Sequence, residues 1–241
     1  MLAGLSVAFD ASCEEMWLAW RHGACLVAAP RSLVRTGMDL GPWLVAHGIT
    51  AVSTVPTLAA LWPAETLDDV RLLIFGGEAC PPELAARLAV EGREVWNTYG
   101  PTEATVVASA ALMTGEGPVR IGLPLDGWDL AVVDAQGEPV EMGGTGELII
   151  GGVGLARYLD PAKDAEKYAP CPASAGSAPT AAVTWSAPSP KDSSSPVAPT
   201  SRSSSAGGGS SWARSTRRSA RCPAWRERRP PSGVSCWSAT S

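Results

Sequence analysis

The composition of this 241-residue chain changes abruptly near residue 170, and this change limits what the chain can fold into. The last 71 residues contain no Leu, Ile, Met, Phe or Tyr, and 53 of them are Ser, Ala, Pro, Gly or Arg. Such a segment has too little apolar surface to offset the entropy that is lost on ordering. We therefore expect residues 171–241 to be disordered and the folded core to lie within residues 1–170.

The charge changes sign at the same place. Residues 1–170 carry a net charge of −12, whereas residues 171–241 carry a net charge of +7. The basic tail can be interpreted as a flexible linker or as an arm that binds nucleic acid. A frameshifted sequence fits the composition better, because GC-rich codons translated out of frame yield Ser, Ala, Pro, Gly and Arg. On that interpretation we expect no nucleic-acid partner.

Targeting and metal-binding patterns are absent from the sequence. The start, MLAGLSVAFDAS, has no basic region and reaches Asp10 after nine residues, so it does not resemble a signal peptide. No run approaches the roughly 20 apolar residues of a membrane span. The six cysteines form no CxxC pair and there are two histidines, which indicates neither a zinc site nor a disulfide framework. We expect a soluble cytoplasmic protein without membrane contact.

The folded part begins with an alternating α/β pattern. Apolar runs typical of strands occupy residues 24–30, 49–55, 70–77 and 93–98. Helical patterns occupy residues 39–48, 56–62 and 81–92. Strands separated by crossover helices predict a mostly parallel sheet, with ligands at the carboxyl ends of its strands.

A second pattern begins near residue 119, where the apolar period changes to two. The segments 128–134 and 145–152 predict antiparallel strands joined by Gly-rich turns. We therefore divide the chain into an α/β part over residues 1–118, a small β subdomain over residues 119–170 and the tail over residues 171–241.

The stretch NTYGPTE, from Asn97 to Glu103, follows a predicted strand and turns sharply at its Gly-Pro pair. Tyr99, Thr102 and Glu103 would then converge on one loop at the carboxyl edge of the sheet. An aromatic ring, a hydroxyl and a carboxylate suit a nucleotide base, a phosphate oxygen and Mg²⁺. A polar turn with a helix cap at Thr102 explains the same residues, and their chemistry alone leaves the choice open.

A family resemblance favours the nucleotide. NTYGPTE resembles the NxYGPTE signature of adenylate-forming enzymes, in particular the amino-acid-activating adenylation domains of nonribosomal peptide synthetases. FDAS at residues 9–12 is similar to the family motif that opens the substrate pocket. GELIIGGVGLARYL at residues 146–159 resembles GELxIxGxGLARGYL, with one Gly absent before Tyr158. The three motifs follow the family's order.

The resemblance implies part of the large N-terminal domain of an adenylate-forming enzyme. Such an enzyme activates an amino acid with ATP and Mg²⁺ and passes it to a phosphopantetheine thiol on a carrier protein. It implies catalytic roles for Thr102, near the α-phosphate, and for Glu103, which would hold Mg²⁺. It also implies a set of nucleotide-binding residues, with Tyr99 stacked on adenine: Gly76, Gly77, Glu78, Asn97, Tyr99, Gly100 and Thr102.

The amino-acid pocket follows from the same alignment. Its implied lining residues are Asp10, Ala11, Glu14, Ser53, Ile74, Gly76, Thr98, Val106 and Val107. By resemblance, Asp10 pairs with the α-ammonium of the substrate. Glu14 adds a second acid, which favours a substrate with a cationic side chain, because a buried carboxylate without a partner is costly. L-lysine is our first expectation and ornithine or another diamino acid the second, unless Glu14 points to solvent and carries no specificity.

The resemblance covers about residues 4–170 and lacks the family's phosphate loop, ribose-binding Asp and catalytic Lys. We therefore expect this stretch alone to have negligible turnover. Two other functions remain open at this point. One is another AMP-forming ligase of the acyl-CoA synthetase type, which Asp10 disfavours, and the other is a non-catalytic binding module with a basic tail.

Overall fold

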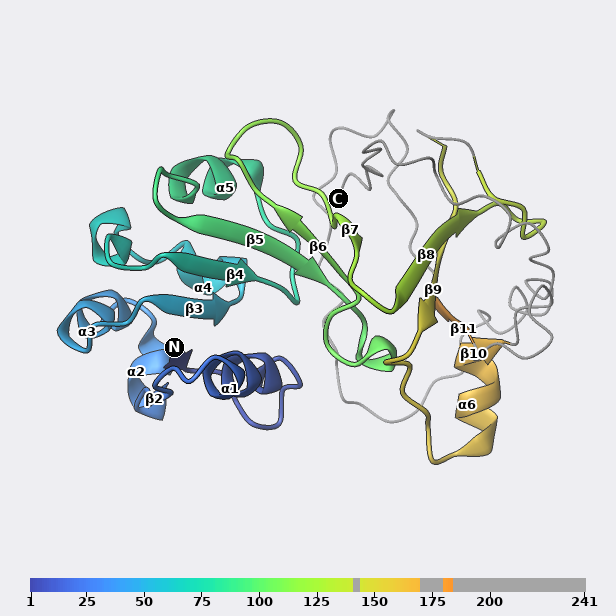
Figure 1. The fold of residues 1–241 in the computed structure, drawn as a ribbon, viewed down its shortest axis with the longest axis horizontal. Coiled ribbons are helices and arrows are strands. Elements are labelled where there is room, and N and C mark those ends of the chain that lie inside the picture. The colour runs from blue at the N-terminus through green and yellow to red at the C-terminus, as the bar shows by residue number, and fades with distance from the viewer. Residues whose placement is uncertain (141–143, 170–179, 184–241) are drawn as a thin grey trace. The chain divides into compact units, whose positions relative to one another are not determined.

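The computed structural model describes residues 1–140, 144–169 and 180–183, which form two units (Figure 1). The first unit spans Met1–Asp126 and the second begins at Gly127. The expected boundary was residue 118, and the first unit extends further because residues 123–124 pair with its sheet. The tail that was expected to be disordered lies outside the described residues, apart from residues 180–183, which form a strand.

The central sheet of the first unit is mixed, with the strand order β3-β4-β5-β6-β7 (Figure 1). Its strands are β3 (Ala51–Thr54), β4 (Leu72–Phe75), β5 (Glu94–Tyr99), β6 (Ser109–Leu112) and β7 (Leu123–Pro124). The predicted strands β3, β4 and β5 are confirmed and run parallel.

The last two strands of this sheet run antiparallel, which the sequence did not predict. A parallel return needs a crossover of a dozen or more residues. The connection from β5 to β6 covers residues 100–108 and contains only a short 3₁₀ helix, Thr102–Ala104, so β6 returns beside β5 in the opposite direction. The α/β class is confirmed, and its sheet is mixed rather than mostly parallel.

The helical segments between the strands are short, and α4 and α5 begin at prolines. The helical segments between strands are α3 (Leu40–Ala46), α4 (Pro56–Ala59), a 3₁₀ helix (Ala64–Leu67) and α5 (Pro82–Leu88). Pro56 and Pro82 each occupy the first helical turn, where a missing N–H costs nothing. No helix in the described ranges is long and apolar enough to span a membrane.

The N-terminal segment forms a separate small sheet. Here β1 (Leu2–Ala3) pairs in parallel with β2 (Val27–Ala28), and α1 (Ser12–Arg21) connects them. The run 24–30 was expected to join the central sheet, but only two of its residues form a strand, and they pair with β1. A further helix, α2 (Arg31–Thr36), follows.

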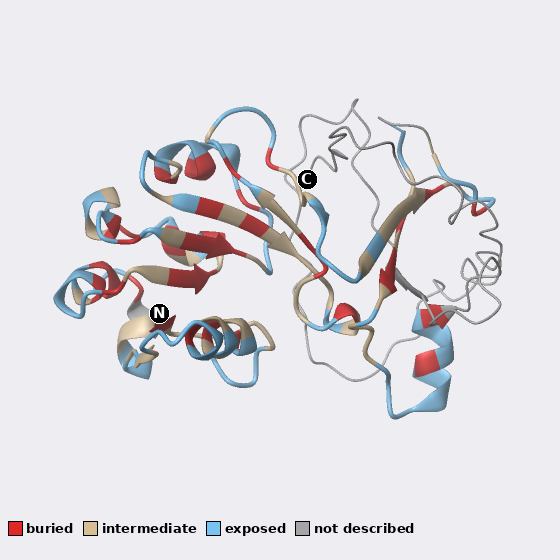
Figure 2. Ribbon diagram, viewed as in Figure 1, coloured by how far each residue is buried: buried red, intermediate tan, exposed pale blue. Residues whose placement is uncertain are grey.

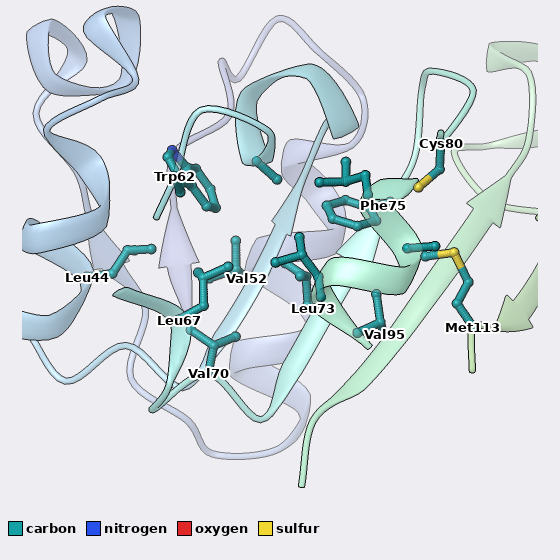
Figure 3. Packing of buried hydrophobic residues seen from close by; sticks show 14 of the residues in the cluster. Leu44, Val52, Trp62, Leu67, Val70, Leu73, Phe75, Cys80, Val95 and Met113 are labelled. Atoms are coloured by element: carbon teal, nitrogen blue, oxygen red, sulfur yellow. The ribbon is translucent and has the colours of Figure 1, made fainter. Parts of the chain in front are cut away.

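The apolar core packs on one face of the central sheet. Figure 2 shows the buried segments of its strands in red. Val52, Leu73 and Val95 are register partners on β3, β4 and β5, and each is fully buried. Figure 3 shows them gathered with the ring of Trp62 and with Leu67 from the connection between β3 and β4. Because side chains alternate along a strand, Ser53, Ile74 and Trp96 face the other way.

One arginine joins three segments at the edge of this core. The guanidinium of Arg93 donates to the carbonyl oxygens of Val70 at 3.0 Å, Leu88 at 3.0 Å and Leu67 at 2.5 Å. Val70 lies at the end of the connection before β4, Leu88 is the last residue of α5, and Leu67 is the last residue of the 3₁₀ helix. Arg93 thereby ties together the chain segments at the amino ends of β4 and β5.

The second unit contains an antiparallel sheet with the strand order β10-β11-β9-β8. Its elements are β8 (Trp128–Val133), β9 (Glu147–Gly152), α6 (Pro161–Lys167), β10 (Tyr168–Ala169) and β11 (Thr180–Val183). The predicted antiparallel pair of residues 128–134 and 145–152 is confirmed as β8 and β9.

The third sequence motif lies in the second unit. GELIIGG supplies β9, and the following segment is anchored by an ion pair between Arg157 and Asp164 of α6. The Asp164 carboxylate also accepts the N–H of Tyr158 at 2.9 Å. Hydrogen bonding to Arg157 lowers the pKa of Asp164 and raises that of Arg157.

Candidate functional site

Several residues predicted to line the amino-acid pocket lie on the face of the central sheet opposite its core. Ser53 on β3 pairs in register with Ile74 on β4, and Ile74 pairs with Trp96 on β5. Gly76 and Thr98 lie two residues further toward the carboxyl ends of their strands. The parallel strands therefore carry one row of pocket candidates toward one edge of the sheet.

Helix α1 brings Glu14 onto this face. The hydroxyl of Ser53 donates a hydrogen bond of 2.6 Å to the Glu14 carboxylate. Burial raises the pKa of Glu14, and the Ser53 hydrogen bond opposes that shift. Within the described part of the chain, no Lys or Arg forms an ion pair with Glu14. The Glu14 side chain therefore turns toward the sheet, where Ser53 is its hydrogen-bond partner, and no cation among the described residues pairs with it.

Asp10 stands at the start of the same helix. The FDAS motif folds as a tight turn, in which the N–H of Phe9 binds the carbonyl of Ser6 at 2.8 Å. The carbonyl of Asp10 accepts the N–H of Cys13 at 2.9 Å, so Asp10 and Ala11 form the lead-in to α1. The half-buried carboxylate of Asp10 makes no hydrogen bond or ion pair with any described residue.

Two glycines after β4 allow the backbone to pack closely against Thr98 and Phe9. A Cβ on Gly76 would lie 2.7 Å from the Thr98 hydroxyl, which itself donates to the Phe75 carbonyl at 3.0 Å. Gly77 has a φ of +77°, and a Cβ there would lie 3.3 Å from the ring of Phe9. The FDAS turn and the glycine loop, predicted from separate motifs, are therefore in contact.

Replacing Gly76 by Ala is expected to destabilise the first unit by about 1–3 kcal/mol, because the new methyl group overlaps the Thr98 hydroxyl in a packed site. Chemical denaturation followed by circular dichroism measures this loss. The double variant Gly76→Ala/Thr98→Ala removes the obstructing oxygen and should recover most of it. A Gly76→Ala variant as stable as the wild type would show that the Thr98 side chain moves aside without cost.

The loop after β5 folds back on itself at Gly100. A Cβ on Gly100 would lie 2.6 Å from the Val106 carbonyl oxygen and 2.8 Å from the Ala108 nitrogen. The Ala108 N–H donates to the Tyr99 carbonyl at 2.8 Å and closes the loop. Within it, burial and the nearby charge of Glu103 both raise the pKa of Tyr99, burial contributing more. The phenol and Glu103 are therefore neighbours.

Val106 adopts a backbone conformation that is rare for a β-branched residue. Its φ is 74° and that of Thr105 is 45°. The N–H of Val107 binds the carbonyl of Thr105 at 3.0 Å across Val106, which closes a three-residue turn. Such conformations cost about 1–3 kcal/mol and occur often at ligand sites. The strain lies in the segment that carries the two pocket candidates Val106 and Val107.

Two predicted nucleotide-binding residues are engaged within the fold. The side-chain amide of Asn97 is buried and donates to the Arg120 carbonyl at 2.8 Å. Glu78 accepts the N–H of Thr57 at 3.2 Å and its hydroxyl at 2.7 Å. Asn97 therefore fixes the connection between β6 and β7, and Glu78 caps the start of α4.

Glu15 is a residue of this region that the sequence analysis missed. Its side chain is 1% exposed, and its carboxylate accepts the N–H of Gly4 at 2.9 Å and that of Leu5 at 3.2 Å. Burial raises its pKa to about 7, and the two backbone hydrogen bonds oppose the shift. The available signal was helical period, because Glu15 lies three residues after Ser12 and four before Ala19, the other buried residues of α1.

These buried acids predict how stability depends on pH. The pKa values of Glu14 and Glu15 are higher in the folded state than in the unfolded state, so protonation of these groups stabilises the fold. This contribution to stability is complete below the ordinary pKa of 4.5 and, for Glu15, is lost as the pH rises through about 7. The melting temperature should fall between roughly pH 5 and pH 8. Glu15→Gln should flatten this profile, and a melting temperature that rises with pH would contradict the account.

The part of the chain that matches known proteins contains the residues of this site. The family model for AMP-binding enzymes matches residues 1–159, which is most of the described chain. This chain belongs to that family. The match includes the FDAS turn, the glycine loop and the NTYGPTE loop, and it extends into the second unit.

Two AMP-binding relatives are peptide or amino-acid polymer synthetases. The chain is 44% identical over 167 residues to Delta-poly-L-ornithine synthetase of Acinetobacter baumannii (strain AB307-0294), covering 68% of this chain and 12% of that protein. It is 38% identical over 169 residues to Phosphinothricin tripeptide synthetase PhsC of Streptomyces viridochromogenes, covering 69% of this chain and 16% of that protein. The chain thus spans a small part of the relatives that it matches.

Solved AMP-binding structures have the same fold. The artificially fused adenylation-PCP di-domain NpsA-ThdA from Klebsiella oxytoca aligns with a TM-score of 0.67 at 27% identity. The alignment covers 76% of this chain and 36% of that one. The architecture is therefore that of part of an adenylation N-terminal subdomain, as the sequence motifs predicted.

Proposed function

We propose that this chain is the central part of an adenylation domain that activates a diamino acid. The reaction joins the amino-acid carboxylate to the α-phosphate of ATP, releases pyrophosphate and then passes the aminoacyl group to a phosphopantetheine thiol on a carrier protein. Membership of the AMP-binding family supports the chemistry. Similarity to a tripeptide synthetase and to a fused adenylation-PCP protein supports the carrier partner.

The Glu14–Ser53 pair carries the proposal for the substrate. A carboxylate held at 2.6 Å by a hydroxyl, raised in pKa by burial and paired with no cation among the described residues, is costly unless a ligand supplies the cation. An ammonium group at the end of a substrate side chain is such a cation. Because Ser53 fixes one carboxylate oxygen, the other remains available to the ligand.

Asp10 supplies the second charge that the substrate needs. Its carboxylate has no partner among the described residues and stands one helical turn before Glu14 on the lead-in to α1. In our proposal it binds the α-ammonium. Two acids on one helix start then match the two ammonium groups of a diamino acid, which disfavours the plain carboxylic acids taken by acyl-CoA synthetases.

L-lysine is the first candidate and ornithine the second. Gly76 packs closely against the Thr98 hydroxyl, and in our proposal Ile74 and the two valines 106 and 107 contact the aliphatic stem of the substrate. Ornithine is favoured by one specific observation, which is that a relative 44% identical to this chain is a poly-L-ornithine synthetase. The two substrates differ by one methylene group, which a hydrophobic pocket distinguishes by about 1–3 kcal/mol.

The loop after β5 suits a magnesium nucleotide. The half-buried ring of Tyr99 offers a face for adenine, the exposed Thr102 hydroxyl offers a phosphate contact, and Glu103 is a carboxylate close to Tyr99. Mg²⁺ commonly binds one or two carboxylates together with substrate phosphates, so one Glu fits it. We expect Glu103→Gln to weaken binding of Mg–ATP but not of adenosine, as measured by calorimetry.

The substrate proposal is tested by equilibrium binding of a matched amino-acid panel to the full chain. L-lysine and L-norleucine differ by the terminal ammonium, and L-ornithine tests the length of the side chain. We expect lysine or ornithine to bind at least about tenfold more tightly than norleucine. Equal binding of lysine and norleucine would exclude a role for Glu14 in specificity.

A further inference from the structure

We propose that Glu15 is a positioning residue for the amino-acid site, and that it acts by clamping the segment which carries Asp10 onto the helix which carries Glu14. The inference rests on the proposed function for the identity of the ligand. The clamp itself follows from the contacts of Glu15. It is distinct from the Glu14–Ser53 pair, because the Glu15 carboxylate is bonded to the backbone amides of residues 4–5 and not to Ser53.

The burial of Glu15 is unusual for a charged group. Glu15 is 1% exposed and lies on the buried side of α1 with Ser12 and Ala19. Glutamate is almost never fully buried unless it is paired or hydrogen-bonded, because the loss of hydration is costly. No described Lys or Arg forms an ion pair with it. Its position in the fold must therefore be held by hydrogen bonds.

Both partners of the carboxylate are backbone amides from one short segment. One oxygen accepts the N–H of Gly4 at 2.9 Å, and the second accepts the N–H of Leu5 at 3.2 Å. The first oxygen also lies 3.3 Å from the Leu5 nitrogen. Two oxygens on two consecutive amides fix the direction of the segment as well as its distance from α1.

The clamp closes a loop that contains both acids of the proposed site. Residues 4–5 lead through the Ser6–Phe9 turn to Asp10, and α1 then returns the chain to Glu15. Asp10 lies between the two ends of this loop, whereas Glu14 is adjacent to the clamp on the helix. The relative position of the two carboxylates depends on residues 4–11 staying against α1.

An amide side chain in place of the Glu15 carboxylate keeps its shape but replaces one of the two acceptor oxygens by an NH₂ group. In Glu15→Gln, one oxygen still accepts an N–H, but the NH₂ group cannot. The remaining oxygen can accept the N–H of Gly4 and, at 3.3 Å, that of Leu5, but the second hydrogen bond to Leu5 is lost, so the segment that carries Asp10 becomes looser. The α-ammonium contact should suffer, while contacts made through Glu14 and Ser53 should persist.

The first test is amide hydrogen exchange of the full chain without ligand. In Glu15→Gln, the amides of Gly4 and Leu5 should exchange about fivefold to tenfold faster, whereas those of β4 and β5 should be unchanged. The matched control is Glu83→Gln, an exposed glutamate on α5. Unchanged exchange at residues 4–5 overturns the clamp. If Glu15→Gln does not fold, Glu15→Asp, which shortens the side chain but keeps its charge, serves in its place.

The second test separates positioning from general damage. 6-Aminohexanoate has the carboxylate and terminal ammonium of lysine but lacks the α-ammonium. Glu15→Gln should weaken L-lysine about threefold to tenfold and leave 6-aminohexanoate unchanged. Equal weakening of both ligands overturns the positioning role. If the wild type binds neither ligand, the proposed function fails, and the exchange measurement still decides whether the clamp exists.

Discussion

Replacing Glu14 by Gln is expected to weaken binding of L-lysine by about 30-fold or more. The variant keeps the size of the side chain and a group that can accept the Ser53 hydroxyl at 2.6 Å, but it removes the charge that balances the substrate ammonium. Truncating one partner of a buried, hydrogen-bonded charge pair typically costs about 2–5 kcal/mol. Isothermal titration calorimetry on the full chain measures the change.

Two comparisons make the Glu14 result specific. Binding of L-norleucine, which carries no side-chain charge, should be unchanged or improved in Glu14→Gln, because a buried charge has been removed. The control variant Glu91→Gln alters an exposed glutamate beyond α5 and should leave both affinities as they are. A Glu14→Gln variant that binds lysine as tightly as the wild type would refute the assignment of this carboxylate.

Replacing Arg93 by Lys is expected to lower the free energy of unfolding of the first unit by about 2–4 kcal/mol. The guanidinium of Arg93 donates to three carbonyls at 2.5–3.0 Å, and one ammonium group cannot reach all three in the same geometry. Carbonyls left without a donor lose their hydrogen bonds at the ends of three segments. Urea denaturation, followed by hydrogen exchange at β4 and β5, reports the loss.

The matched control for Arg93 is Arg71→Lys. Arg71 is exposed at the start of β4 and its side chain makes none of these carbonyl contacts. This control should change stability by less than about 0.5 kcal/mol. If both variants lose the same stability, the three carbonyls are satisfied in another way and Arg93 does not join the segments.

The strands of the α/β part were predictable where burial on both faces produced continuous apolar runs. LLIF is such a run and became β4, whereas EVWNTY, which became β5, mixes apolar and polar residues. The strand β6 was missed because three of the four residues of SAAL are small. Its place in the sheet depends on pairing with β5, which is a long-range contact that local pattern does not encode.

Helix α1 shows why side-chain direction could not be predicted from hydrophobicity. Trp17 and Trp20 are 65% and 55% exposed, whereas Glu15 is 1% exposed. The two tryptophans of this helix therefore point outward and a glutamate points inward. Hydrophobic periodicity assigns the opposite orientation. The inward position of Glu15 depends on two backbone amides of residues 4–5, which the helix sequence does not contain.

The motifs predicted which residues belong to the candidate site. They did not predict the hydrogen bonds that these residues make. Glu14 was expected to face the pocket, and the structure gives it Ser53 as a partner from a strand 39 residues away in sequence. Asn97 and Glu78 were expected at the nucleotide, yet their side chains hold the Arg120 carbonyl and the start of α4. Motif spacing identifies which residues gather at a strand end, whereas hydrogen-bond partners depend on the packed fold.

The most direct test of the central claim is a crystal structure of this chain with L-lysine. We predict the terminal nitrogen of lysine within about 3 Å of the Glu14 carboxylate, which still accepts the Ser53 hydroxyl, and the α-ammonium at Asp10. A lysine bound with its terminal ammonium in solvent, or a Glu14 that contacts Ser53 alone, would contradict the assignment of this pocket to a diamino acid.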